Sequence, residues 1–260
     1  MTAWLAIVIL WAVLAVALTV VWTVRRRRGP LDTGASTAFI GSALGLLLSL
    51  ILFFVMGHRS EAQTAARVEA TASTTLFSSM TLLPDRMSNP TQHAVVCVME
   101  SIADDEWPEM AAGDPDGSLV THARTARLYD AIGRLPATDP AVQPYFPALW
   151  ARMLERAAAR DARLAQAPPR VAVPIWAVIF TGVFVLVMLI GVQERISGRG
   201  AWIGVSAALI VVLTMLVGVI AVLDSPYGPG APIGPDAMRN SLELVRSGQP
   251  ADSPVIAPCT

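Results

Sequence analysis

Four long, uncharged apolar runs constrain this sequence more than any other feature. A helix that crosses the hydrocarbon layer of a membrane, about 30 Å thick, needs about 20 apolar residues. Four segments meet this requirement without a charged residue: 4–24, 37–56, 171–192 and 201–223. Because hydrocarbon offers no water to satisfy backbone groups, such segments fold as helices. The sequence therefore predicts an all-α membrane protein with four transmembrane helices.

The overall composition supports a bilayer as the main partner. Charged residues make up 15% of the chain, against roughly 25% in soluble domains, and the mean hydropathy is +0.54. The formal net charge is −1, whereas nucleic-acid binding normally requires a basic excess. We expect no nucleic-acid partner.

The spans form two pairs separated by a polar insert. The first pair occupies residues 1–56 and the second occupies residues 171–223, so residues 57–170 form an extramembrane insert. A turn and a short amphipathic helix follow over residues 224–247. The last segment, 248–260, is rich in small and polar residues and is expected to be disordered.

Helical periodicity recurs along the insert. The second span is expected to continue out of the membrane, and the other expected helices cover residues 92–107, a segment from Ser118, and residues 145–166. The inward positions expected in the first two of these are Val95, Val96, Met99 and Ile102, then Leu119, Ala123, Ala126 and Ile132. The last helix carries one charged stripe, made of Arg152, Arg156, Arg160 and Arg163.

No pattern typical of an enzyme or a cofactor site occurs in the chain. The histidines His58, His93 and His122 share no metal-ligand spacing. All 19 basic residues are arginine, which excludes a lysine Schiff base or a P-loop lysine. We expect neither catalysis nor a bound cofactor or metal.

An acidic run in the insert is the closest approach to a calcium site. Asp104, Asp105, Glu106 and Glu109 lie close together. A calcium loop needs six to eight oxygen ligands at a defined spacing, which this run lacks. The sequence favours a solvated helix end.

The two cysteines, Cys97 and Cys259, lie far apart in the chain and form no CxxC pair. Cys97 stands on the apolar face of its helix, which favours a buried free thiol. A disulfide with Cys259 is the alternative if the insert lies in an oxidising compartment.

Two features of the second span suggest contacts beyond ordinary burial. Gly41, Gly45 and Ser49 place a small residue at every fourth position, a ridge that lets another helix approach closely. The partner helix is either in the same chain or in another subunit. Phe53 and Phe54 form a hydrophobic pore collar in one interpretation and face lipid in the other.

Basic residues near the spans predict the orientation of the chain. Arginines occupy residues 25–28 in one short loop, and Arg195 and Arg199 lie in the other. Short cytoplasmic loops carry such an excess. We therefore expect a multi-pass protein of a bacterial plasma membrane, with the insert and both termini extracytoplasmic.

The segment after the fourth span is the most distinctive part of the sequence. Asp224, Pro226, Tyr227 and Gly228 form a post-span turn within the motif DSPYG. A short helix follows, with Pro235 and Asp236 suited to its first turn. Its narrow apolar stripe consists of Met238, Leu242 and Val245.

This arrangement of spans, insert and turn resembles the bestrophin-like family, in its mainly bacterial branch. Bestrophins have an Asn-Pro-Phe-Gly turn at the corresponding place, and residues 225–228 are similar to it. The continuation of the second span into a helix with Glu61 and Glu69 is also similar. The resemblance implies a pentameric chloride channel with its insert in the cytoplasm, so it and the charge count predict opposite orientations.

Calcium gating in bestrophins depends on an acidic run after this turn. Here residues 228–238 contain a single acid, Asp236, so calcium gating is not expected. One functional hypothesis is an oligomeric passive anion channel, a homo-oligomer that conducts chloride or another small anion. The alternative is a non-conducting membrane protein whose helical insert binds a partner or senses the state of the envelope.

Overall fold

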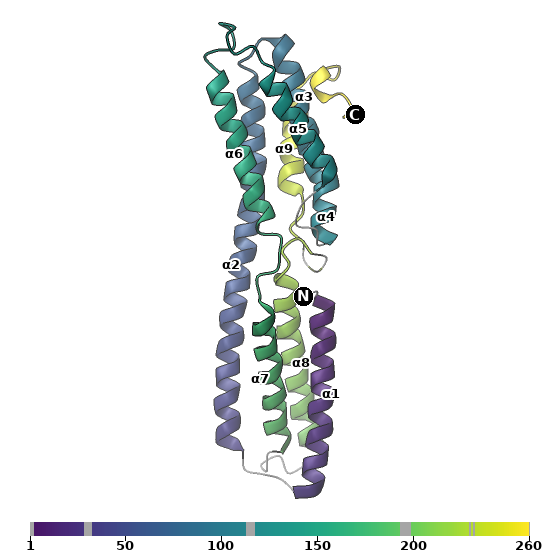
Figure 1. Ribbon diagram of the computed structural model, residues 1–260. Helices are drawn as coiled ribbons and strands as arrows, with labels where there is room; N and C mark the ends of the chain where they lie inside the picture. Colours follow the sequence, from purple (N-terminus) through teal and green to yellow (C-terminus); the bar gives the residue numbers. More distant parts are fainter. Residues whose placement is uncertain are drawn as a thin grey trace. The chain divides into compact units, whose positions relative to one another are not determined.

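All regular secondary structure in the described part of the chain is helical, as the sequence predicts (Figure 1). The computed structural model describes residues 3–28, 33–112, 118–192, 199–228, 230 and 232–259. The chain divides into two compact units. The first consists of Met1–Arg59 and Pro169–Ser225, and the second consists of Ser60–Pro168 and Pro226–Thr260. The second unit thus joins the expected insert to the C-terminal segment.

The first unit is built from the apolar helices. It contains α1 (Ala3–Arg28), the first part of α2 (Gly34–Met80), α7 (Val173–Val192) and α8 (Arg199–Leu223). Helix α1 packs against α7 and α8. The core side chains are aliphatic or aromatic, and Trp176 stacks on Phe180 with ring centroids 5.8 Å apart.

Two of these helices, α2 and α7, are long and apolar enough to cross a membrane. The described parts of α1 and α8 contain shorter apolar stretches, Ile7–Val21 and Ala207–Leu223. The count of four spans therefore stays a prediction for α1 and α8.

Helix α2 is continuous over 47 residues (Figure 1). The residues that follow its apolar part are mostly Ala, Thr, Ser and Glu, and they include one glycine, Gly57, and no proline before Met80. Alanine and glutamate are good helix formers, so the helix has no local reason to end. The predicted continuation of the second span as a helix is confirmed.

The second unit packs several amphipathic helices around one core. Its elements are the last part of α2, α3 (Asp85–Ser101), the π-helix η1 (Ile102–Glu106), α4 (Trp107–Ala112), α5 (Leu119–Gly133), α6 (Phe146–Leu164), α9 (Asp236–Ser247) and the short 3-10 helix η2 (Pro254–Ile256). Ser118 caps α5 by accepting a hydrogen bond from the backbone N–H of Val120. The predicted stripe of α9, Met238, Leu242 and Val245, is buried.

The inward face of α5 matches the sequence prediction at Ile132, which is fully buried, and differs from it at the other three positions. Leu119 is 83% exposed, Ala123 and Ala126 are exposed, and Leu128 is fully buried instead. The Thr121 hydroxyl, on the same face, donates a hydrogen bond to the backbone oxygen of Ser101. Alanine buries little apolar area, so Ala123 and Ala126 gave a weak pattern that this tertiary contact overrides.

The C-terminal segment is also more ordered than expected. Residues 254–256 form η2, with Ser253 as its N-cap, and Val255 is completely buried in the core of the second unit. The prediction of disorder over residues 248–260 is therefore wrong for the described residues of that segment. An apolar anchor and a covalent link hold the segment in place.

Candidate functional site

The arginine stripe of α6 lies mostly inside the second unit. Arg156 and Arg163 are fully buried and Arg160 is nearly so. Two buried carboxylates accompany them, Glu69 from α2 and Glu106 from η1. We call these five residues the buried charge cluster.

Arg163 connects the two carboxylates of this cluster. Its guanidinium forms ion pairs with Glu69 and with Glu106. Arg160 also binds Glu106, with a hydrogen bond of 3.1 Å from Nε to Oε2. Burial alone would lower the pKa of Arg163, but the charges and hydrogen bonds of the two carboxylates raise it. Arg163 therefore stays charged.

The π-helix η1 positions Glu106. The expected α-helix over residues 92–107 changes to a π-helix here, in which a backbone N–H bonds to the carbonyl oxygen five residues earlier and not four. Such π-turns are often found at functional sites. Burial alone would raise the pKa of Glu106, but Arg163 and Arg160 hold it below its usual range. The prediction of a solvated acidic run is wrong for Glu106. It fits Asp104, which is exposed and lies 3.2 Å from Arg239.

Aromatic residues close the cluster on one side. The Arg163 guanidinium carbon lies 4.6 Å from the ring centroid of Trp107, a cation–π contact. Trp107 donates a 2.7 Å hydrogen bond to the backbone oxygen of Ile233 and meets Tyr227 edge-on, with ring centroids 5.9 Å apart. Tyr227 in turn donates to the backbone oxygen of Ala62, and burial raises its pKa to about 12.

Arg156 is the one member of the cluster without a hydrogen-bond partner among the described residues. Its Nε, Nη1 and Nη2 atoms are all buried and unsatisfied. Burial lowers its pKa, although the charge of Glu69 opposes this shift. The cluster thus contains three arginines and two glutamates, a buried excess of positive charge.

Residues of the post-span turn form hydrogen bonds in both units, and different residues do so in each. In the first unit, Oδ1 of Asp224 accepts hydrogen bonds from the backbone N–H groups of Arg170 and Val171, at 3.0 and 2.9 Å. In the second unit, the backbone oxygen of Pro226 accepts a 2.8 Å hydrogen bond from Ile233. Gly228 is half-buried in the same turn.

The candidate pore residues of α2 are open in the single chain. Phe53 is 78% exposed and Phe54 is 57% exposed. Of the small-residue ridge, a side chain added at Gly41 would meet Leu186 of α7 at 3.6 Å, whereas one at Gly45 would meet nothing within 4 Å. The exposed Ser49 hydroxyl donates to the backbone oxygen of Gly45. The roles of these residues stay predictions.

Among the described glycines of the first unit, the closest contacts occur on α7, at positions that no sequence pattern indicates. A Cβ atom at Gly191 would lie 2.5 Å from a methyl group of Val21, and one at Gly182 would lie 2.9 Å from Leu44. Both glycines let neighbouring helices approach closely. Their spacing matches no small-residue ridge, so only the packing identifies them.

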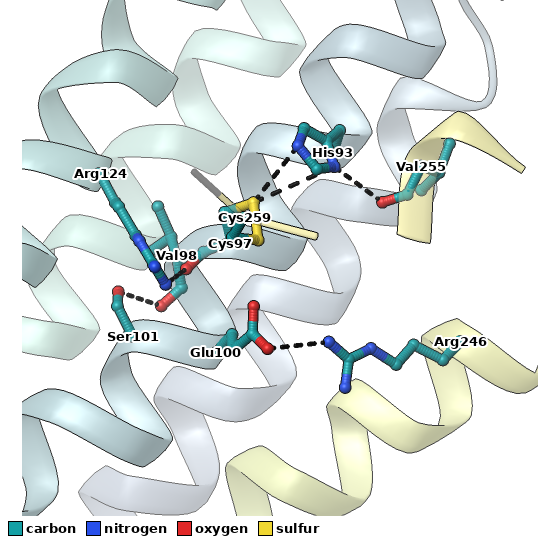
Figure 2. Close-up of a disulfide and its surroundings, with 9 residues drawn as sticks. All are labelled: His93, Cys97, Val98, Glu100, Ser101, Arg124, Arg246, Val255 and Cys259. Atoms are coloured by element: carbon teal, nitrogen blue, oxygen red, sulfur yellow. Dashed lines mark hydrogen bonds and ion pairs between the residues drawn. A yellow bond between two sulfur atoms is a disulfide. The ribbon is translucent and has the colours of Figure 1, made fainter. Parts of the chain in front are cut away.

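Cys97 and Cys259 form a disulfide that links α3 to the C-terminal segment (Figure 2). The expectation of a free buried thiol at Cys97 is therefore wrong, and the alternative pairing is present. The two Cα atoms are 5.5 Å apart although the residues are separated by 162 positions in sequence. His93 lies beside the disulfide, with Nε2 3.5 Å from the Cys97 sulfur.

Comparisons with known proteins agree with this architecture. The sequence profile described as the Bestrophin-like domain matches residues 6–238, and a comparison with curated proteins gives no significant match. Crystal structures of a bacterial bestrophin homologue from Klebsiella pneumoniae share the fold. A single-substitution variant has a TM-score of 0.70 at 15% identity and covers 96% of this chain and 100% of its own. A further structure of that homologue has the same score and identity and covers 95% and 98%.

The family match bears directly on the resemblance noted in the sequence. It includes both candidate spans, the whole insert and the post-span turn. The known members of the family are membrane-embedded anion channels and not enzymes. Because the match covers most of the chain, this protein belongs to the bestrophin-like family.

Proposed function

We propose that this chain assembles into an oligomeric, passive anion channel that conducts chloride or another small anion without calcium gating. The bare face of α2 is the observation that carries the proposal. Phe39, Leu46, Leu50 and Phe53 follow one another at helical spacing and are each more than 60% exposed in the single chain. One helix cannot enclose a pore, so a ring of copies would have to bring these faces together.

The chemistry of α2 suits passive conduction. Its apolar part, residues 37–56, carries no ionisable side chain, whereas pumps and coupled transporters usually need intramembrane charges. Hydrophobic constrictions can gate a pore by dewetting. Phe53 and Phe54 would form such a constriction near one mouth.

The absence of calcium gating follows from the charge distribution after the turn. Asp236 is the single acid in residues 228–238, and Asp224 already binds two backbone N–H groups. A calcium site needs several oxygen ligands. We expect anion flux to be the same with calcium and with a calcium chelator.

The channel proposal can be tested with the full chain purified in detergent. We expect a mass several times that of the protomer and chloride flux after reconstitution into liposomes. A Phe53→Ala, Phe54→Ala double variant should conduct faster because the constriction widens. Met215→Ala is the matched control, since this exposed apolar residue lies on α8 and should leave flux unchanged.

A monomer or dimer without chloride flux would overturn the channel proposal. The non-conducting alternative would then gain support, with the second unit as the partner-binding part. An oligomer whose chloride flux is unchanged by the double substitution would support the channel proposal and contradict the proposed constriction at Phe53 and Phe54.

We further propose that the second unit and both termini are extracytoplasmic, in the plasma membrane of a bacterium. Two observations support this orientation: the arginines of the short loops and the disulfide between Cys97 and Cys259, because disulfides persist in oxidising compartments. Trapping free thiols in acid-quenched cells tests it. Cys97 and Cys259 should resist alkylation until a reductant is added, and immediate labelling of both would place them in the cytoplasm.

A further inference from the structure

Three potential metal ligands converge where the C-terminal segment meets α3. They are a ring nitrogen of His93 and the sulfur atoms of Cys97 and Cys259, and all lie within 4.8 Å of one another. Within the described ranges, no other set of three histidine, cysteine or acidic ligands is this compact. Figure 2 shows the imidazole beside the disulfide, with contacts to the Cys97 sulfur and to the backbone oxygen of Val255.

A hydrogen bond fixes the chemical state of His93. Its Nδ1 lies 3.1 Å from the backbone oxygen of Val255. A carbonyl oxygen can only accept, so Nδ1 must carry the proton and donate it. In the neutral imidazole, Nε2 is then left with a free lone pair, and this atom is the ring nitrogen nearer to the Cys97 sulfur, at 3.5 Å against 4.0 Å for Nδ1. Metal-binding histidines are usually oriented by such a bond to a carbonyl oxygen.

The spacing of His93 and Cys97 fits a tetrahedral zinc ion. With Zn–S and Zn–N bonds of about 2.3 and 2.1 Å, two ligands of a tetrahedral site lie about 3.5 Å apart. The observed distance from Nε2 to the Cys97 sulfur is 3.5 Å. Both residues stand on the same face of α3, four positions apart, so the helix already holds two ligands at the required separation.

The C-terminal segment would keep the third ligand nearby without the disulfide. Val255 is completely buried in the core of the second unit, and its carbonyl holds His93. Cys259 follows only four residues later and is half-buried. Its sulfur therefore has to move only a short way to leave room for an ion.

We propose that His93, Cys97 and Cys259 bind Zn²⁺ when the disulfide is reduced, with water as the fourth ligand. A dithiol reductant would supply two electrons and two protons to the sulfur–sulfur bond and become a disulfide itself. Zn²⁺ then replaces the two thiol protons, which pass to solvent, and coordinates two thiolates and Nε2. The disulfide and the zinc site exclude each other, and each fastens the C-terminal segment to α3. This inference does not depend on the channel function or on the orientation in the membrane.

Zinc titration of the full chain in detergent tests the proposal. The protein is reduced with a phosphine, which does not compete as a thiol would, and Zn²⁺ is titrated against a chromophoric chelator. Reduced protein should bind one equivalent that the oxidised protein does not bind. Co²⁺ in place of Zn²⁺ should give the visible absorption of a tetrahedral site together with thiolate-to-metal charge transfer.

Single substitutions assign the ligands. His93→Gln and Cys259→Ser should each weaken zinc binding at least about tenfold. His122→Gln is the control, because this exposed histidine lies on α5 and its loss should leave the affinity unchanged. Circular dichroism checks that each variant retains its helices.

Any of three results would overturn the zinc site. One is equal zinc binding by the reduced wild type and a Cys97→Ser, Cys259→Ser double variant. A second is unchanged affinity in His93→Gln, which would remove the imidazole from the site. A reduced wild type that binds no zinc would show that the segment leaves α3 and would equally contradict the proposal.

Discussion

The two units of this chain both bury an apolar core, but they differ in the number of charged side chains that they bury beside it. The core of the first unit is aliphatic and aromatic, and its helices leave large apolar residues such as Phe53 and Met215 exposed. The second unit buries five charged residues of the buried charge cluster beside its apolar core. Against hydrocarbon, exposure of apolar side chains costs no free energy. A unit in water is stabilised by burying them, whereas a buried charge costs free energy unless it is paired, as Arg160 and Arg163 are and, among the described residues, Arg156 is not.

Among the substitutions considered, loss of the Glu106 charge should lower the free energy of unfolding of the second unit most. Glu106→Gln leaves Arg160 without its carboxylate partner and Arg163 with Glu69 alone, and breaking a buried pair costs about 3–5 kcal/mol. The measurement is the free energy of unfolding of the purified chain, followed by circular dichroism. Glu155→Gln disrupts the exposed pair with Arg152 and should cost about 1 kcal/mol or less. Equal effects of the two substitutions would contradict a structural role for the buried pair.

The pH dependence of stability should report the same carboxylate. Arg163 and Arg160 lower the pKa of Glu106 below its ordinary value of 4.5 in the folded chain. Its contribution is therefore complete above about pH 4.5 and is lost as the pH falls through the folded pKa. Thermal midpoints of the wild type should drop more steeply over this acid range than those of Glu106→Gln. If the thermal midpoints of wild type and variant fell in parallel with pH, other carboxylates would account for the acid dependence of stability.

Loss of the disulfide should have the next largest effect, again in the second unit. Cys259→Ser removes the link between α3 and the C-terminal segment, and a native disulfide typically contributes about 2–4 kcal/mol. We expect faster proteolysis of the C-terminal segment and a lower unfolding midpoint without reductant. With a phosphine reductant, wild type and variant should become alike in metal-free buffer. A difference that persists there would point to a role of the side chain outside the disulfide.

In the first unit, the largest effect should come from close packing and not from charge. Gly191→Ala would place a methyl group 2.5 Å from Val21, and overpacking of this kind costs about 1–3 kcal/mol. Gly218→Ala on α8 is the control, since nothing lies within 4 Å of the added atom and alanine favours a helix by about 0.5–1 kcal/mol over glycine. Retention of helicity on heating in detergent compares the two. A stabilising Gly191→Ala would show that α1 and α7 do not approach as closely as described.

The substitution at Gly45 is expected to have the smallest effect on the stability of the protomer. Its effect on assembly of the oligomer should be large. Gly45→Leu adds a side chain where the single chain has open space, so its stability should change by no more than about 0.5 kcal/mol. If the ridge meets another subunit, the oligomer should dissociate, as measured by mass in detergent. Ala43→Leu, at an exposed position off the ridge, should leave the mass unchanged. An unchanged mass for Gly45→Leu would place the subunit contact elsewhere.

Local sequence patterns sufficed for much of the architecture. Four features depend on residues that are only a few positions apart. They are the apolar runs, the many helix-forming residues after residue 56, the Ser118 cap and the stripe of α9. Such patterns translate directly into helices. The post-span turn was informative for the same reason, since Pro226 and Gly228 dictate local backbone geometry and led to the correct family.

The candidate sites lay beyond such patterns. Arg163 meets Glu69 across 94 positions, and the disulfide spans 162. The run of acids at residues 104–109 gave no sign that a π-turn would bury Glu106 and leave Asp104 in solvent. The sequence by itself determined most of the helical segments and identified α2 and α7 as apolar enough for a membrane, because helix formation and hydropathy are local properties. Only the tertiary structure decided which charges are paired, which cysteines are joined and which glycines are crowded, because those depend on contacts between segments that are distant in the chain.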